Sequence, residues 1–217
     1  MAYDFASCWE IFKQYKEEKC NLMKPCVTVL RNHSLVSTDL ADFDKRFTND
    51  IKILVIGPNG SGKSTLSKAL GRKYGIPICH LDKLHWEANW RRVDNKVFLD
   101  RVLDVLEDNG PIIMDGDYAS SLQMRLKYAD MVIRIKMNPV ICLINVLKRK
   151  ILNNSNVRED MAEGCFERLK PSFLWKSISY KQHSGIQTDE VLLKYHGDLL
   201  NINGKRQLNR VLELLQK

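Results

Sequence analysis

A glycine-rich octapeptide separates a run of apolar residues from a helical pattern. The stretch Gly57–Ser64 matches the phosphate-binding pattern G-x-x-x-x-G-K-[ST] at every fixed position. Its glycines let the backbone curl until successive N–H groups point at one anion, and the positive end of the following helix points there too. We therefore predict an ATP site, with GTP as the less favoured nucleotide. The predicted nucleotide-binding residues are Gly57, Pro58, Asn59, Gly60, Ser61, Gly62, Lys63, Ser64 and Thr65.

Two residues of this loop carry chemistry of their own. The ammonium group of Lys63 is expected to bridge the β- and γ-phosphates, and the hydroxyl of Ser64 is expected to bind Mg²⁺. A chance glycine turn in front of a helix is the alternative. The strand pattern before the loop and the helical pattern after it both favour the nucleotide site.

Two carboxylates follow predicted strands. Asp82 comes after residues 78–81, and Asp115 comes after residues 112–114. Both are expected where parallel strands end, which is the edge at which open α/β sheets bind ligands. Asp115 is predicted to hold Mg²⁺ directly or through a water, and Asp82 to orient or deprotonate an acceptor, or to contact the water shell of the metal. Either acid could instead cap a helix, and for Asp82 the two interpretations are evenly balanced.

Arginines are the third component, because phosphoryl transfer places negative charge on the transferring group. Arg149 and Arg158 flank the polar stretch 153–157, whereas Arg91, Arg92 and Arg125 lie nearer the two acids. A charged helix face is usually only solvated, so this alternative stays open for each of them. Arg158 stands out because nothing around it suggests a packing role. We predict that it closes over the phosphoryl group together with Arg149.

The elements that position these residues alternate between strand and helix from residue 51 onward. This alternation predicts an α/β fold, a parallel sheet covered by helices on both faces. The expected strands are 51–56, 78–81, 112–114, 131–137 and 198–202. The expected helices are 63–74, 94–109, 139–152, 165–182 and 205–216, with a polar loop at 153–164 acting as a short lid.

The first fifty residues have a different character. Phe5, Trp9 and Phe12 form an apolar stripe on a predicted helix over 1–24, which favours packing against the main domain over binding a partner or a second copy. A short strand at 27–30 and a helix at 38–47 are expected to follow. The predicted domains are a mostly helical extension, 1–50, and a P-loop domain, 51–217.

Composition narrows the class of ligand. The chain has 217 residues and a net charge of +8; residues 1–50 carry −1, so the remainder carries +9. No basic stripe is interleaved with aromatic residues, which favours a small anionic ligand over nucleic acid. Six scattered cysteines, no apolar run of membrane length and no secretion signal together predict a cytoplasmic protein with reduced thiols and no membrane partner. The histidine spacing predicts no zinc site.

Three further stretches, Leu81–Trp86, Met114–Tyr118 and Arg158–Cys165, follow the P-loop in this order. Together they resemble the small P-loop kinases known as DNA topology modulation proteins, relatives of adenylate and shikimate kinases, over about residues 51–217. The resemblance implies a five-stranded parallel sheet in the order 2-3-1-4-5. It makes Arg149 and Arg158 lid residues and puts Asn203 near the adenine. The residues that it places around the acceptor are Asp82, His85, Trp86, Arg92, Asp115, Tyr118 and Arg125.

Two functions fit these residues. The first is a kinase that transfers the γ-phosphoryl group of ATP to a small molecule, nucleotide-like or another hydroxyl or phosphate compound. The second is a nucleotide-dependent switch with weak ATPase activity that acts on DNA or a protein partner. Asp117 stands where that family usually has asparagine, and Ala119-Ser120 where Ser-Arg is common, and both departures weigh against a nucleoside monophosphate as the acceptor. The missing arginine near Ser120 slightly favours the second function. His85, Trp86 and Tyr118 can line an acceptor pocket or simply pack. We expect the protein to be either a monomer or a homodimer.

Overall fold

The computed structural model describes residues 33–34, 50–152, 161, 164–165 and 184–216. The helices predicted at 1–24, 38–47 and 165–182, the strand at 27–30 and most of the lid loop, with Arg158, lie outside the described residues. Those expectations, and the division into two domains, therefore remain predictions.

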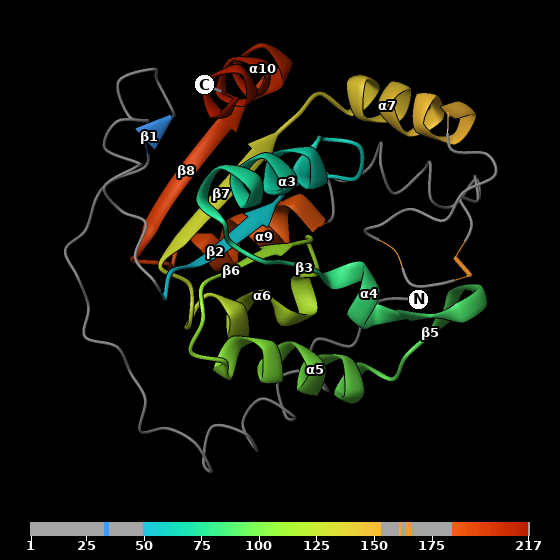
Figure 1. Ribbon diagram of the computed structural model, residues 1–217, viewed down its shortest axis with the longest axis vertical. Helices are drawn as coiled ribbons and strands as arrows, with labels where there is room; N and C mark the ends of the chain where they lie inside the picture. The colour runs from blue at the N-terminus through green and yellow to red at the C-terminus, as the bar shows by residue number, and fades with distance from the viewer. Residues whose placement is uncertain (1–32, 35–49, 153–160, 162–163, 166–183, 217) are drawn as a thin grey trace.

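A parallel sheet forms the centre of the molecule (Figure 1). Its strands are β1 (His33–Ser34), β2 (Lys52–Ile56), β3 (Ile78–His80), β6 (Ile112–Asp115), β7 (Met131–Lys136) and β8 (Asp198–Asn203). The order across the sheet is β1-β8-β7-β2-β6-β3, and every pairing in it is parallel. From β3 to β8 this is the order 2-3-1-4-5, so the predicted topology is confirmed. The two-residue strand β1 at the β8 edge was not predicted.

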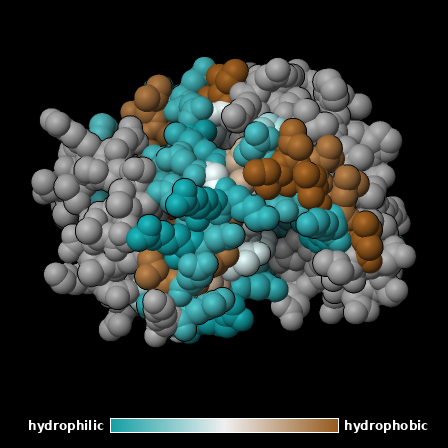
Figure 2. All heavy atoms as spheres, turned by 90° about the horizontal axis from the view of Figure 1, so that it is seen from above, coloured by the Kyte–Doolittle hydropathy of each residue, from teal (hydrophilic) through white to brown (hydrophobic). Residues whose placement is uncertain are grey.

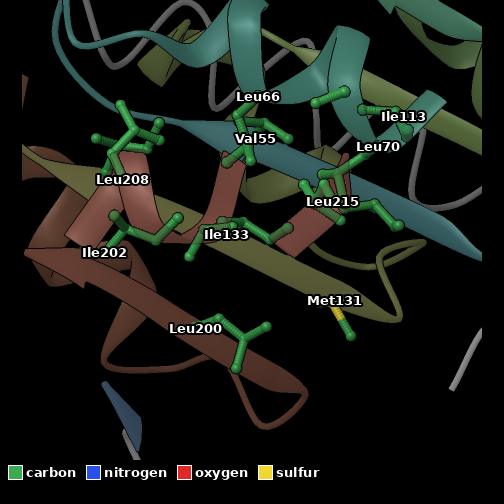
Figure 3. Packing of buried hydrophobic residues seen from close by; sticks show 14 of the residues in the cluster. Val55, Leu66, Leu70, Ile113, Met131, Ile133, Leu200, Ile202, Leu208 and Leu215 are labelled. Atoms are coloured by element: carbon green, nitrogen blue, oxygen red, sulfur yellow. The ribbon is translucent and has the colours of Figure 1, made fainter. Parts of the chain in front are cut away.

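Helices cover both faces of the sheet, as the alternating pattern predicts. On one face lie α3 (Lys63–Tyr74) and α10 (Gly204–Leu215), whose leucines pack on alternate residues of the central strands (Figure 3). The residues labelled in that core are Val55, Leu66, Leu70, Ile113, Met131, Ile133, Leu200, Ile202, Leu208 and Leu215. Because side chains alternate along a strand, Leu54, Met114 and Val132 point to the opposite face.

That opposite face is covered by α5 (Asn95–Glu107), α6 (Ala119–Arg125) and α9 (Ser184–Leu192). Phe98, Val102 and Leu106 of α5 form most of its apolar contact with the sheet. The side chain of Asp94 accepts a hydrogen bond from the backbone N–H of Lys96 and so caps the start of α5. The predicted helix 94–109 is thus confirmed with slightly narrower limits, whereas α9 was not predicted.

Short elements between β3 and α5 differ from the expectation. The strand predicted over 78–81 ends at His80, because the helix α4 (Leu81–His85) begins at the next residue. After it, β4 (Trp86–Glu87) and β5 (Arg91–Arg92) form an antiparallel hairpin around the short helix η1 (Ala88–Trp90). These elements lead the chain from Asp82 back to α5.

The helix α7 (Pro139–Leu152) has the predicted limits and follows β7. It exposes an apolar row of Val140, Ile144, Leu147 and Ile151. Figure 2, the view from above, shows a hydrophobic patch beside hydrophilic surface on this side of the molecule. Among the described helices, none has the length and apolar character needed to cross a membrane.

Candidate active site

The glycine-rich loop connects β2 to α3, as predicted. Gly57, Gly60 and Gly62 have φ angles of 143°, 79° and 95°, a region that residues with a side chain rarely adopt. Space also requires glycine: a Cβ atom on Gly57 would lie 2.5 Å from the carbonyl oxygen of Ile135, and one on Gly60 2.3 Å from that of Cys142. The loop is therefore enclosed by β7 and α7, and its course is fixed by its surroundings.

Hydrogen bonds also define the conformation of this loop. The amide of Asn145, on α7, donates to the carbonyl oxygen of Gly60 at 2.8 Å, and the N–H of Ser61 donates to that of Pro58 at 3.1 Å. Asn145 was not singled out from the sequence, because it lies far along the chain in a helix with an apolar pattern. Within the loop, Pro58 and Ser61 are buried and Asn59 is exposed.

The start of α3 can accept an anion. Its N-cap is Gly62, no side chain caps its first N–H groups, and its first turn holds no acidic residue. Lys63 opens the helix, and its Nζ donates to the carbonyl oxygen of Pro58 at 2.9 Å. This ammonium group lies over the loop, so a phosphate bound there would be within its reach. Ser64 is half-buried in the same turn, and Thr65 is exposed.

Asp115 ends β6 beside the strand that leads into the loop. It pairs in register with Val55 on one side and with His80 on the other. Because equivalent positions of parallel strands point to one face, Asp115 faces the layer of α3, where Val55 packs. The N–H of Gly116 donates to the carbonyl oxygen of Val55 at 3.1 Å, which ties the end of β6 to β2.

The two oxygens of the Asp115 carboxylate have different surroundings. Its Oδ2 lies 2.8 Å from Nδ1 of His80, and the residue is only 4% exposed. Its Oδ1 is buried and has no hydrogen-bond partner among the described residues. A buried oxygen without a donor costs free energy that a bound cation can offset. Carboxylate and hydroxyl oxygens are the ligands Mg²⁺ prefers, so Asp115 and Ser64 fit this ion.

Asp82 lies two residues beyond the end of β3, the strand that neighbours β6. It is the second residue of α4, is half-buried, and its Oδ1 accepts a hydrogen bond of 2.5 Å from the hydroxyl of Tyr118. A Cβ atom on Gly116 would lie 2.9 Å from the Cβ of Leu81, so α4 packs directly on the end of β6. The structure therefore brings both predicted carboxylates to the edge at which the parallel strands end.

An aromatic cluster adjoins Asp82. The ring centroid of the buried His85 lies 4.9 Å from that of Trp86, 4.9 Å from that of Phe98 and 4.6 Å from that of Tyr118. Phe98 is fully buried and forms the back of the cluster. Three residues predicted for the acceptor side thus lie together, and two of them, His85 and Tyr118, also pack on the core residue Phe98.

The hairpin extends this cluster outward. Trp90 lies edge-on to Trp86 with 5.5 Å between ring centroids. Asn89 and Trp90 have φ angles of 63° and 64°, and the left-handed region is unfavourable for a large side chain. Neither residue was selected from the sequence. The strained backbone of Trp90 thus holds its ring against Trp86, and strained residues gather at binding sites.

Arg125 has a different environment from the one expected. It is fully buried, and it donates to the hydroxyl of Ser121 at 3.1 Å and to the carbonyl oxygens of Gly116 and Tyr118 at 3.0 Å each. Burial lowers the pKa of its guanidinium to about 10, although the charge of Asp117 raises it. In this structure the side chain supports the loop after Asp115 from within, rather than facing an acceptor.

The remaining predicted residues lie on three different elements, β5, α7 and β8. Arg92 is exposed on β5 and pairs in register with Trp86. Arg149 is half-buried on α7, four residues after Asn145, so it shares the helix face that contacts the loop. Asn203 ends β8, where its backbone N–H donates to Oε1 of Gln207 at 2.5 Å.

Neither a protein-family model nor a curated protein matches the chain. Among solved structures, it is similar to a gluconokinase from Sinorhizobium meliloti 1021, with a TM-score of 0.50, 16% identity, and coverage of 78% of this chain and 91% of that one. It is also similar to the shikimate kinase from Acinetobacter baumannii in complex with shikimate, with a TM-score of 0.51, 15% identity, and coverage of 79% and 94%. At these identities the likeness shows only a shared α/β fold. The finer resemblance to DNA topology modulation proteins stays a prediction.

Proposed function

We propose that the protein is an ATP-dependent kinase that transfers the γ-phosphoryl group to a hydroxyl- or phosphate-bearing small molecule. The observation that carries this proposal is the placement of two carboxylates at the carboxyl end of β6 and just beyond that of β3, on the side of the sheet where β2 leads into the glycine-rich loop. Asp115 faces the layer of α3 with an unsatisfied oxygen, and Asp82 lies two residues beyond the end of β3. Fixed groups of this kind supply most of the catalysis of phosphoryl transfer, which depends on positioning and charge.

The loop would hold the triphosphate. Its N–H groups and the uncapped start of α3 would face the bound phosphates, and Lys63 would exchange the carbonyl oxygen of Pro58 for phosphate oxygens. Mg²⁺, which neutralises charge on the phosphates, would be held by Ser64 and Asp115. Arg149, on the helix face that contacts the loop, is proposed to neutralise the charge of the transferring group, together with Arg158.

Asp82 would act on the acceptor. For a hydroxyl acceptor, the oxygen forms a bond to the γ-phosphorus while the bond from that phosphorus to the β–γ bridging oxygen breaks. The hydroxyl proton passes to the Asp82 carboxylate, and ADP leaves with the bridging oxygen. The hydrogen bond from Tyr118 holds one oxygen of this carboxylate and fixes its orientation. A phosphate acceptor needs no proton transfer, so Asp82 would then only orient it.

The test is acceptor-dependent release of ADP from ATP and Mg²⁺. A panel of sugar acids, nucleosides, nucleoside monophosphates and cyclic alcohols is compared with a no-acceptor control. We expect one class to raise ADP release well above background, and Asp82→Asn to abolish that increase for a hydroxyl acceptor while ATP binding is retained. Asp104→Asn, an exposed carboxylate on α5, serves as the matched control.

Two results would overturn the proposal. The first is slow hydrolysis that no acceptor raises; if DNA or a protein partner changed its rate, the nucleotide-dependent switch would be the better account. The second is full acceptor-dependent turnover of a hydroxyl compound in Asp82→Asn, because the proton would then have to leave by another route.

A further inference from the structure

His80 is a buried residue that the proposed transfer does not yet use. It ends β3, is 9% exposed, and its Nδ1 lies 2.8 Å from Oδ2 of Asp115. A carboxylate accepts hydrogen bonds, so Nδ1 carries the proton and donates it. The contact lies on the face of the sheet that α3 covers. It is at the carboxyl ends of the strands, where the nucleotide loop also begins.

Backbone pairing fixes this contact. Ile78, Cys79 and His80 pair in register with Ile113, Met114 and Asp115. The two side chains are therefore lateral neighbours on one face of a parallel pair, and the backbone register keeps their Cβ atoms side by side. The helix α4 begins directly after His80, which limits movement of the strand end further.

The bond leaves the two carboxylate oxygens unequal. Oδ2 is held by the imidazole, whereas Oδ1 is buried without a partner among the described residues. Partial rotation of the carboxylate about its Cβ–Cγ bond would turn both oxygens away from these positions, and the bond from His80 opposes that rotation. One oxygen thus stays directed at the position where the proposed function requires a cation.

We propose that His80 is a positioning residue which holds Oδ2 of Asp115 so that Oδ1 is presented to the divalent cation accompanying the nucleotide. The inference rests on the proposed function, and it assigns to His80 a role that acts only through Asp115. Partners that orient metal-binding side chains in this way typically change metal affinity by about tenfold to a hundredfold when they are replaced.

The alternative is a purely structural pair, in which the bond only satisfies two buried polar groups. Both accounts predict that removing the donor lowers the free energy of unfolding, because a buried carboxylate loses its partner. They differ in the affinity of the folded protein for the cation. A structural pair leaves that affinity unchanged once the variant is folded, whereas a positioning residue changes it.

The experiment measures binding of Mn²⁺, a paramagnetic substitute for Mg²⁺, at saturating ADP by electron paramagnetic resonance. His80→Phe removes the donor and keeps a ring, and His80→Ala removes it without adding bulk against Asp115. His80→Asn retains an N–H close to the position of Nδ1. His196→Asn is the control. His196 is exposed and lies in the loop before β8, at the amino end of that strand, whereas His80 is at the carboxyl end of β3. Urea unfolding shows which variants are folded under the assay conditions.

We expect His80→Phe and His80→Ala to bind Mn²⁺ at least about tenfold more weakly than the wild type. His80→Asn should stay within about threefold, and His196→Asn should be unchanged. Wild-type affinity in folded His80→Ala, or equal weakening in His80→Asn, would overturn the inference alone. If the wild type bound no Mn²⁺ with ADP, the proposed function would fail, and the role of His80 with it.

Discussion

Replacing Gly60 by alanine tests whether the course of the glycine-rich loop depends on its contact with α7. The new Cβ atom would lie 2.3 Å from the carbonyl oxygen of Cys142 and 3.0 Å from a methyl group of Val146. Gly60 also has a φ angle of 79°, so the substitution imposes strain on the backbone as well as overlap. Gly75 provides a matched control, because its φ is 68° and nothing lies within 4 Å of its added Cβ.

The two effects can be separated by magnitude. The left-handed conformation costs an alanine roughly 1–2 kcal/mol, and Gly75→Ala should lose about this much stability and nothing else. In Gly60→Ala the Cβ must move by about 1 Å to reach the 3.4 Å of an ordinary contact. The opposing atom belongs to the backbone of a helix, so the loop is the part that shifts. Displacement of catalytic groups by about 1 Å can cost a hundredfold, and we expect ATP affinity to fall by tenfold to a hundredfold.

The assay combines urea unfolding, followed by circular dichroism, with calorimetric titration of ATP in the presence of Mg²⁺. Gly75→Ala should bind ATP within about twofold of the wild type despite its lower stability, and Gly60→Ala should not. If both variants bound ATP equally well, close packing of the loop against α7 would not be what holds it in its binding conformation.

Three further predictions follow from single contacts. Tyr118→Phe removes a hydrogen bond to the carboxylate of Asp82 and should lower acceptor-dependent kcat by about tenfold or more, with ATP affinity unchanged in calorimetry; unchanged kcat would contradict the role given to Tyr118. The hydrogen bond from Arg134 lowers the pKa of Asp189, so Asp189→Asn should destabilise the protein at neutral pH. The difference in stability between the variant and the wild type should vanish as the pH falls below 3.8 through that lowered pKa. A difference in urea midpoint that persisted in acid would contradict this. Burial raises the pKa of Cys79 to about 11, so peptide mapping should find it unlabelled by iodoacetamide in the native protein at about pH 8 and labelled in urea.

Long elements with a clear period could be predicted from the sequence. The strand before Gly57, the helix α3 and the helix α7 have almost the predicted limits, because apolar periodicity, Pro139 and the glycines mark them. The elements between Leu81 and Arg92 could not be predicted in the same way. Each has two to five residues, too few to show a period, and β4 and β5 are strands only through their pairing with each other.

The candidate site was predictable where it depends on strand ends. Asp82 and Asp115 follow predicted strands, and parallel strands end on one side of the sheet, so the pattern predicts that the two acids lie near each other. The pairing of His80 with Asp115 requires the register of two strands that are far apart in sequence. No signal in the sequence indicates it, because the predicted strands end at residues 81 and 114, whereas the observed strands end at His80 and Asp115. The burial of Arg125 depends on carbonyl groups turning inward, which residue types do not reveal.

The central claim is that the backbone between Gly57 and Ser64 binds the phosphates of ATP. Calorimetric titration of ATP with Mg²⁺ into the wild type, Lys63→Ala and Lys73→Ala tests it most directly, since Lys73 is an exposed lysine at the far end of the same helix. We expect wild-type affinity in Lys73→Ala and at least about tenfold weaker binding in a folded Lys63→Ala, because a charge-assisted hydrogen bond to phosphate is lost. No binding by the wild type, or equal affinity in all three proteins, would contradict the account.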